Sequence, residues 1–356
     1  MSVGEIILAP MEGVLDYPLR EALTDYNRYD YCVSEFIRVT DVIFPNKVFR
    51  REVPELKNDG RTRSGTPVWV QILGTDPDIL AGNALVAARC GAPGVDLNFG
   101  CPSKFVHRSG GGAAMLKKPA VIGEAVRKTR DLLPADVPLS VKIRLGWENP
   151  DDIGRIYEEI VNAGADRIII HARTRMDGYR ADAIKWEYIA PLADRGEITL
   201  VANGEVRDAE SAARCMEVTH CDNLMVGRYA LAVPNLEGVI RNGDRPFTVT
   251  ESVRALIHFV DIMKNLLPEQ YQMARTKQFL SYVRLSNPEV NLFFREICQT
   301  KSQADIDRIL DDVVSGKRDL TIRDTQDSRT GDDSGTDAVT DEVRPVKKAH
   351  ERYCRN

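Results

Sequence analysis

Cys101 has the residue type and the setting for proton-transfer chemistry. It follows Asn98-Phe99-Gly100 and precedes Pro102, directly after a short apolar run. A free thiol with a pKa of about 8.5 is mostly protonated at neutral pH, so it can donate a proton without prior activation. The other six cysteines are scattered and never lie at Cys-x-x-Cys spacing, which excludes the usual zinc and disulfide patterns. Cys101 is therefore the candidate acid, and no metal site is expected.

Polar residues also lie within the last part of the other short apolar runs or directly after them. In chain order they are Pro10-Met11-Glu12, Glu35 and Arg38, Gln71, Lys142 and Arg144, His171, Asn203-Gly204-Glu205, and Gly227-Arg228. Any one of them has an ordinary explanation, such as a loop hydrogen bond or a tight turn at a glycine. Their recurrence at the same end of successive runs is what indicates a site, because the carboxyl ends of barrel strands form the active site of such folds.

Eight short apolar runs alternate with amphipathic stretches of helical periodicity. The runs are Ile6–Ala9, Tyr31–Glu35, Val68–Leu73, Val95–Asn98, Leu139–Arg144, Arg167–His171, Ile198–Ala202 and Leu224–Val226. Helices are expected over Asp76–Cys90, Pro119–Leu133 and Asp151–Ala163. This alternation predicts βαβ units and a parallel sheet, and eight strands favour a closed (β/α)8 TIM barrel.

The character of the chain changes after Pro246. Residues 251–310 show helical periodicity with no strand-like run, and residues 324–342 are polar, with seven acids and one base. The sequence therefore predicts a catalytic barrel over 1–245, a helical domain over 246–312 and a disordered acidic tail over 313–356.

The net charge is distributed unevenly between the predicted tail and the rest of the chain. The whole chain carries −5, of which the stretch 324–342 contributes −6, so the rest carries +1. A nearly neutral body permits binding to RNA without arguing for it. The chain has no apolar run of 18 residues and no signal-peptide pattern at its N-terminus. We expect a cytoplasmic protein that acts as a monomer, with no membrane partner.

The ordered motifs resemble those of the tRNA-dihydrouridine synthase family. The resemblance is carried by Gly94–Ser103 with Gly110–Ala113, and by Ala9–Gly13, Val141–Gly146, His171–Thr174, Asn203–Glu205 and Val226–Arg228, in the same order. It covers roughly residues 5 to 310. The Ser-Gly-Gly-Gly run and Gln278–Tyr282 look most like the C-type bacterial subgroup, which acts on uridine 16 in the D-loop.

The resemblance implies FMN as bound cofactor, NADPH as reductant and the reduction of a tRNA uridine to dihydrouridine. The residues expected to contact FMN are Pro10, Met11, Glu12, Gln71, Lys142, His171, Asn203, Gly204, Glu205, Gly227 and Arg228. Asn98 would hold the target uracil, and Cys101 would give a proton to C5 while flavin N5 gives a hydride to C6. Ala172, Glu205 and Tyr229 depart from the residues common in the family.

The target base lies inside folded tRNA, so it must be extruded into the pocket. The residues expected to contact tRNA around the barrel mouth are Arg38, Tyr179, Arg180, Arg275, Lys277, Tyr282 and Arg284. No Gly-x-Gly-x-x-Gly motif follows a strand, so no residues are assigned to NADPH. Two alternatives remain: an FMN barrel reductase of a free small molecule, such as a dihydroorotate dehydrogenase or an ene-reductase, and a non-catalytic RNA-binding protein.

Overall fold

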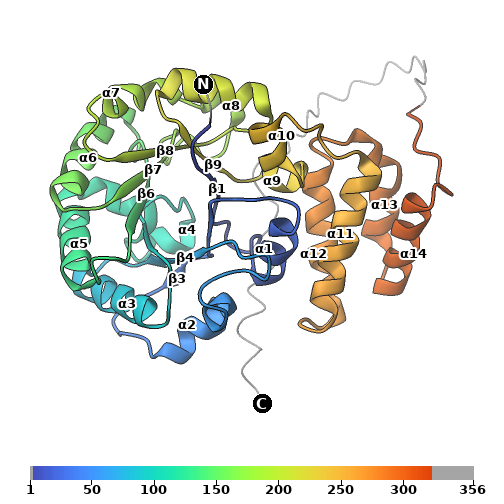
Figure 1. Cartoon of the computed structure of the whole chain (residues 1–356), viewed down its shortest axis with the longest axis horizontal. Helices are drawn as coiled ribbons and strands as arrows, with labels where there is room; N and C mark the ends of the chain where they lie inside the picture. The colour runs from blue at the N-terminus through green and yellow to red at the C-terminus, as the bar shows by residue number, and fades with distance from the viewer. Residues whose placement is uncertain (1–2, 323–356) are drawn as a thin grey trace.

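The computed structural model describes residues 3–322, which form a closed parallel barrel with a group of helices beside it (Figure 1). The strands are β1 (Ile6–Leu8), β2 (Tyr31–Val33), β3 (Ile37–Arg38), β4 (Val68–Leu73), β5 (Val95–Asn98), β6 (Leu139–Arg144), β7 (Arg167–His171), β8 (Thr199–Asn203) and β9 (Asn223–Val226). All eight predicted strands are present, with ends that differ by at most two residues. The TIM-barrel prediction is confirmed.

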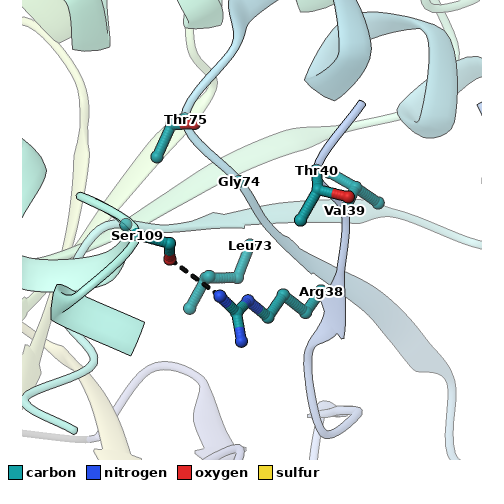
Figure 2. A pocket seen from close by; sticks show the side chains of 8 residues that line it. Arg38, Val39, Thr40, Leu73, Gly74, Thr75 and Ser109 are labelled. Carbon is teal, nitrogen blue, oxygen red and sulfur yellow. Dashed lines mark hydrogen bonds between the residues drawn. The ribbon is translucent and has the colours of Figure 1, made fainter. Parts of the chain in front are cut away.

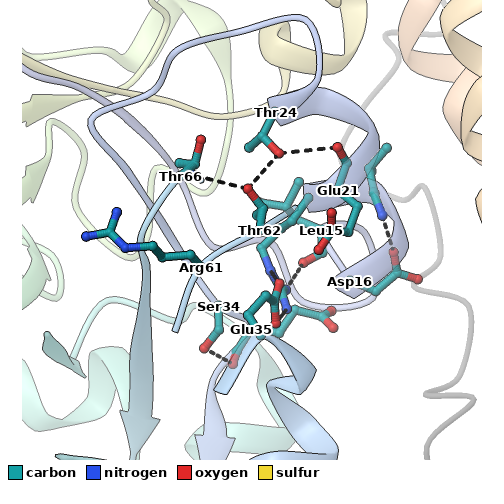
Figure 3. Close-up of polar contacts among 12 residues, drawn as sticks. Leu15, Asp16, Glu21, Thr24, Ser34, Glu35, Arg61, Thr62 and Thr66 are labelled. Carbon is teal, nitrogen blue, oxygen red and sulfur yellow. Dashed lines mark hydrogen bonds and ion pairs between the residues drawn. The ribbon is translucent and has the colours of Figure 1, made fainter. Parts of the chain in front are cut away.

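The second barrel position is a strand in two parts. β2 pairs with β4 through Cys32 and Val68, and β3 pairs with the same strand through Ile37 and Ile72. The predicted run Tyr31–Glu35 forms a strand only as far as Val33, and Ile37–Arg38 is a further short strand that was not predicted. Between the two strands the hydroxyl of Ser34 donates to the carbonyl of Glu35 at 3.0 Å (Figure 3). The β2–β4 pairing closes the barrel, since β1 joins β2 to β9 on the other side.

Helices surround the barrel, as the alternation predicted. They are α1 (Tyr17–Thr24), α2 (Asn46–Glu52), α3 (Pro77–Arg89), α4 (Lys104–His107), α5 (Pro119–Leu132), α6 (Ile153–Asn162), α7 (Ala190–Ala193), α8 (Ala209–Thr219), α9 (Tyr229–Ala232) and α10 (Leu236–Asn242). Asp76 caps α3 by accepting from the N–H groups of Asp78 and Ile79. This cap and the proline at the first helical position explain why the helix begins there.

An aromatic and cationic cluster fills the end of the barrel where the strands begin. The rings of Tyr31 and Trp69 are stacked with centroids 4.2 Å apart, and the guanidinium of Arg167 lies 4.9 Å from the ring of Trp69. The inner side chains above them are apolar and buried. Because this end is filled, a ligand can approach the barrel axis at the opposite end, where the strands finish.

The chain after β1 is fastened to the barrel side by buried polar contacts. Arg20 pairs with Glu55 at 2.7 Å and donates to the carbonyl of Leu15 at 2.8 Å. On the same side, the hydroxyl of Thr62 receives a hydrogen bond from the hydroxyl of Thr24 at 3.1 Å (Figure 3). These contacts fix the segment that follows the β1 loop.

Four helices follow the barrel: α11 (Val249–Lys264), α12 (Glu269–Val283), α13 (Asn291–Gln299) and α14 (Gln303–Val314). α11 packs on α1 and α12 packs on α9, so the group lies against the first and last parts of the barrel (Figure 1). The predicted division near residue 245 falls between α10 and α11, and separate folding of the two parts stays a prediction.

The predicted tail begins too early at 313, because α14 extends through Val314. The rest of that prediction, over residues 323–356, lies outside the described residues. Within residues 3–322, none of the helices has the length and apolar character needed to cross a membrane.

Candidate active site

The loop that carries Cys101 is held by hydrogen bonds to its backbone. Asn98 ends β5, and its side-chain oxygen accepts from the N–H groups of Gly100 at 2.9 Å and Cys101 at 3.0 Å. The carbonyl of Cys101 accepts from the N–H of Ala113 at 3.0 Å and lies 2.9 Å from Nε2 of His107. The backbone of Cys101 is therefore fixed on both sides at the barrel mouth.

A close approach of the chain to itself holds the same loop. Gly112 has a φ of 57°, and a Cβ there would lie 2.7 Å from the carbonyl oxygen of Cys101. Gly110 also has a positive φ, 77°, but a Cβ there would meet only a methyl of Thr75 at 3.9 Å. Gly112 is thus needed for space as well as for backbone conformation, whereas Gly110 is needed for conformation alone.

The thiol of Cys101 packs beside the apolar side chains of Phe36, Leu73 and Val106. Burial raises the pKa of the Cys101 thiol to about 11, although a hydrogen bond with the backbone of Ser103 acts in the opposite direction. A group with this pKa is fully protonated at neutral pH. The structure therefore supplies a neutral thiol, which can act as an acid and is a poor nucleophile.

A chain of side-chain hydrogen bonds runs from the barrel interior to this loop. The amide nitrogen of Gln71 donates to Asp96 at 2.6 Å, and the amide nitrogen of Asn98 donates to the oxygen of Gln71 at 2.8 Å. Ser140 donates to the other oxygen of Asp96. Burial raises the pKa of Asp96 to about 6, so it is ionised at pH 7 and can only accept. Asp96 thereby sets the direction of both amides and leaves the oxygen of Asn98 facing the Cys101 loop.

Lys142 occupies the mouth next to this chain. Its ammonium donates to the side-chain oxygen of Asn203 at 3.0 Å, and the amide nitrogen of Asn203 donates to the carbonyl of Met225 at 2.8 Å. Burial lowers the pKa of Lys142 to about 8, although nearby Asp96 acts in the opposite direction. Lys142 is mostly protonated at neutral pH, so it supplies a positive charge at the barrel mouth.

His171 is held as a neutral ring. Burial lowers the pKa of His171 well below its ordinary value, and the surrounding cations, led by Arg144, act in the same direction. Its Nε2 lies 3.1 Å from a guanidinium nitrogen of Arg173, which has only hydrogens to offer. His171 therefore accepts at Nε2, and its proton is on Nδ1.

Two guanidinium groups contact one carboxylate at the barrel mouth. The guanidinium groups come from the loops after β7 and β9, and the carboxylate comes from the loop after β8. Arg173 pairs with Glu205 at 2.9 Å, and Arg228 pairs with the same carboxylate oxygen. Glu205 has a φ of 56°, a left-handed conformation that is costly for a residue with a side chain and that these two ion pairs hold in place. Two positive charges against one negative charge leave an excess of positive charge at this point of the mouth.

The turn at Gly227 has open space beside its backbone. A Cβ at Gly227 would meet nothing nearer than Ala9 Cβ at 3.7 Å and Met11 Sδ at 3.8 Å. This also places Met11, from the loop after β1, beside the end of β9. Pro10 and Met11 are partly exposed, and Glu12 is exposed.

These groups fit a flavin mononucleotide. The phosphate of such a ligand needs N–H groups and a cation, which the Gly227-Arg228 turn offers beside the excess positive charge. Its pyrimidine edge needs donors, acceptors and a positive charge. Asn203 and Lys142 supply these at the mouth, and the fully buried Gln71 is hydrogen-bonded to Asn98 there. The structure thus brings the sequence-predicted cofactor residues to one end of the barrel, and their contacts with FMN stay a prediction.

Comparisons with known proteins show which family the chain belongs to. The dihydrouridine synthase (Dus) family model matches residues 7–312. The chain belongs to the dihydrouridine synthase family. It is similar to the tRNA-dihydrouridine(16) synthase of Vibrio parahaemolyticus, with 47% identity over 82% of this chain and 91% of the relative. The enzyme of the same name from Escherichia coli strain K12 is 44% identical over 86% of this chain and 97% of the relative. As a dihydrouridine synthase, the chain is a flavin oxidoreductase.

Solved structures at low identity show the barrel fold of this dihydrouridine synthase. Morphinone reductase superposes with a TM-score of 0.51 at 13% identity, over 68% of this chain and 87% of that protein. Histamine dehydrogenase from Rhizobium sp. 4-9 also gives 0.51, at 11% identity, over 73% of this chain and 49% of that protein.

Some of the residues predicted to contact tRNA lie at the mouth of the dihydrouridine synthase barrel. Tyr179 is 39% exposed, with the guanidinium of Arg144 5.0 Å from its ring and Arg228 3.4 Å from its carbonyl. Arg38 ends β3 at the same mouth, and Arg180 is exposed. Contact of these residues with tRNA stays a prediction.

The cations predicted on α12 have partners within the protein. Arg275 is only 5% exposed, and its guanidinium contacts the carbonyls of Gly13 and Val14 and the carboxylate of Asp16. Lys277 donates to carbonyls at the end of α13, at 3.2 and 3.1 Å. These contacts assign both cations a docking role, so the predicted shared contact with phosphate gains no support here. Tyr282 is buried, and Arg284 donates to Asn291.

Two positioning residues were not singled out from the sequence. Asp96 gave a usable signal, since it is an ionisable residue in the middle of an apolar strand. Gly112 gave none, because its neighbours in the Gly110–Gly112 run look identical and only the fold shows which glycine meets Cys101.

Proposed function

We propose that this dihydrouridine synthase reduces uridine 16 of tRNA to 5,6-dihydrouridine, with FMN as its bound cofactor and NADPH as its reductant, and that it acts as a monomer. Support for the position comes from relatives of 43–47% identity that carry the name tRNA-dihydrouridine(16) synthase. Support for the chemistry comes from the arrangement of the barrel mouth described above.

The cofactor would be held by groups at the ends of several strands. Gly204, Gly227 and Arg228 would hold the phosphate, while Gln71 and Lys142 would meet the pyrimidine edge of the ring. Bound FMN supplies a hydride to C6 of the uracil. Met11 and His171 complete the lining, and the neutral state of His171 avoids a further positive charge beside Lys142.

Residues of the chain itself would bind the uracil and supply the proton. Asn98 uses one amide hydrogen on Gln71, so the other is free to meet a uracil carbonyl. Cys101 gives its proton to C5, and the cations Lys142 and Arg144 near its sulfur favour the thiolate that remains. Tyr179 and Arg38 lie where the strand of tRNA around the extruded base would pass.

The observation that carries the proposal is the place of Cys101 at the barrel mouth, on a loop whose backbone N–H groups donate to the side chain of Asn98. Cys101→Ala should lower dihydrouridine formation by at least about 100-fold, the usual minimum loss for a general acid. Flavin absorbance of the purified protein should be unchanged. The measurement is mapping of dihydrouridine in tRNA from a strain that lacks this enzyme, complemented with wild type or variant. Dihydrouridine at wild-type levels with Cys101→Ala would remove Cys101 from the mechanism.

The raised pKa of Cys101 gives a second test. An acid is active below its pKa, so thiol protonation should not limit turnover between pH 6 and 9 and should be lost only as the pH rises through about 11. Alkylation requires the thiolate and should rise over the same range. Iodoacetamide labelling, read at the Cys101 peptide by mass spectrometry, measures this midpoint. A midpoint near the ordinary value for a free thiol would contradict the buried acid.

A further inference from the structure

Phe105 is an aromatic ring in an unexpected place. It lies four residues after Cys101 in the short helix α4, and its 68% exposure is the largest of any bulky apolar side chain among residues 3–322. Its neighbour Val106 is buried beside Cys101. Val106 therefore anchors the helix beside the active site, while Phe105 exposes its aromatic ring to solvent.

A cation lies against this ring. The guanidinium of Arg38 is 4.6 Å from the ring centroid, and it donates to the hydroxyl of Ser109 in the same loop at 2.8 Å. The ring is thus fixed by a cation–π contact while most of its surface stays open. Arg38 and Phe105 come from different barrel positions, so the contact is made by the fold and not by neighbours in sequence.

A small pocket opens beside the same guanidinium. Figure 2 shows Arg38 extending to Ser109, with Thr40 and Thr75 in the loops that follow β3 and β4. Thr40 donates to Asp41 at 2.7 Å, and Gly111 completes the lining. The pocket therefore offers hydroxyl groups and a guanidinium, a lining suited to ribose and phosphate oxygens.

The charge of the segment around Phe105 indicates which kind of partner it can bind. Residues 97–123 contain no acid, and they contain the bases Lys104, Arg108, Lys117 and Lys118. Lys117 and Arg175 both lie over the ring of Trp147, at 3.9 and 5.0 Å. Cations interleaved with aromatic rings are typical of surfaces that bind single-stranded nucleic acid.

We propose that Phe105 and Arg38 form a stacking platform for the nucleobase next to the target uridine of tRNA, with the phosphate of that nucleotide on Arg38. The proposal rests on the proposed function. Extrusion of one base leaves its neighbour without a stacking partner, and an exposed ring near the acid can replace that partner. Stacking of this kind does not depend on base identity, because every base has an aromatic face.

The test compares Phe105→Leu with Phe105→Tyr, by tRNA binding and by KM for tRNA. Phe105→Leu should raise both Kd and KM by about 5- to 100-fold, the usual effect of losing one stacked base, while Phe105→Tyr should stay near wild type. The matched control is Leu132→Ala. Leu132 is 49% exposed at the end of α5, where the chain returns to the start of β6 and so lies at the far end of the barrel. Wild-type Kd and KM for Phe105→Leu would overturn the proposal.

An abasic substrate makes the test specific to stacking. A tRNA that lacks the base on one side of the target uridine should bind wild type more weakly, and the loss should disappear in Phe105→Leu. Equal losses in the two proteins, on either side of the target, would also overturn the proposal. Arg38→Gln should lower the slope of log Kd against log salt by about 1, as loss of one phosphate contact does.

These outcomes separate the platform from the proposed function. If wild type forms no dihydrouridine in tRNA but binds it in a manner that depends on Phe105, the function fails and the platform stands. If wild type modifies uridine 16 and Phe105→Leu does so with unchanged KM, the platform fails and the function stands.

Discussion

A side chain at position 112 would occupy the space of the Cys101 carbonyl. Gly112→Ala should therefore displace the loop and lower dihydrouridine formation at least about 10-fold, since small misplacements of catalytic groups are costly. Gly110→Ala is the matched control, because it carries the same positive-φ penalty of about 1 kcal/mol without the collision. Thermal unfolding should show similar losses of stability for both variants, and a turnover assay should separate them. Equal loss of turnover would indicate that backbone conformation, not space, is what the loop requires.

The carboxylate of Asp96 gives a second expectation at the residue scale. As the pH falls through about 6, Asp96 gains a proton and can donate, so it no longer fixes the amides of Gln71 and Asn98. Turnover should fall over this range. Asp96→Asn should be slow at every pH, by roughly 5- to 100-fold, because a buried donor then lacks an acceptor.

Ser140→Ala is the control for that expectation. The hydrogen bond from Ser140 lowers the pKa of Asp96, so its removal should move the acid limb of the pH profile to higher pH. Stability has the opposite sign to turnover: the folded protein binds this proton more tightly than the unfolded chain, so the contribution of Asp96 to stability falls as the pH rises from about 4 to 6. A pH profile that Ser140→Ala leaves unchanged would exclude Asp96 as its cause.

The reactive residues could be predicted from the sequence, whereas most of the residues that hold them in position could not. Cys101 and Asn203 come soon after apolar runs and Lys142 interrupts one, which is a local signal that needs no knowledge of contacts. The partners that tune them are set by pairing between strands. Asp96 meets Gln71 across β5 and β4 and Ser140 across β5 and β6, and register of this kind is not written in either strand alone.

At the scale of elements, runs of apolar residues gave all eight barrel positions, and tertiary contacts decided the exceptions. The second strand ends before Ser34, whose hydroxyl accepts from the backbone N–H of Gln71 on β4. α12 shows the same limit. Its basic residues were predicted to face RNA, but a buried guanidinium and an exposed one look alike in sequence, and Arg275 binds the loop after β1.

The contacts of Arg275 predict that it docks α12 onto the barrel. Arg275→Met keeps the apolar stem but removes the guanidinium that donates to the carbonyls of Gly13 and Val14 and pairs with Asp16. It should lower the free energy of unfolding by about 3 kcal/mol. The slope of log Kd for tRNA against log salt should stay unchanged, because the guanidinium is not available to phosphate. Arg308→Met, at an exposed position on α14, is the control for loss of one positive charge. A smaller salt slope with normal stability would instead place Arg275 on the RNA.

At the scale of the whole molecule, one end of the barrel is filled and the other carries the chemistry. Tyr31, Trp69 and Arg167 close the end where the strands begin, and α11–α14 lie against its side. A large polyanion must therefore approach the open mouth, over the basic segment 97–123. Its approach depends on the charge of the entire chain as well as on local contacts.

Residues 324–342 are predicted to oppose that approach through charge alone. Their removal changes the net charge from −5 to +1. The chain that lacks residues 324–342 should bind tRNA more tightly than wild type at 0.05 M salt. The difference in Kd should vanish near 1 M salt, where charges interact over only about 3 Å. A full-length variant with the seven acids replaced by Asn or Gln and Arg329 replaced by Gln should match the deletion, because it carries the same net charge of +1 and keeps the length. If that variant binds like wild type while the deletion binds more tightly, the segment acts by occupying space and not by repelling the polyanion.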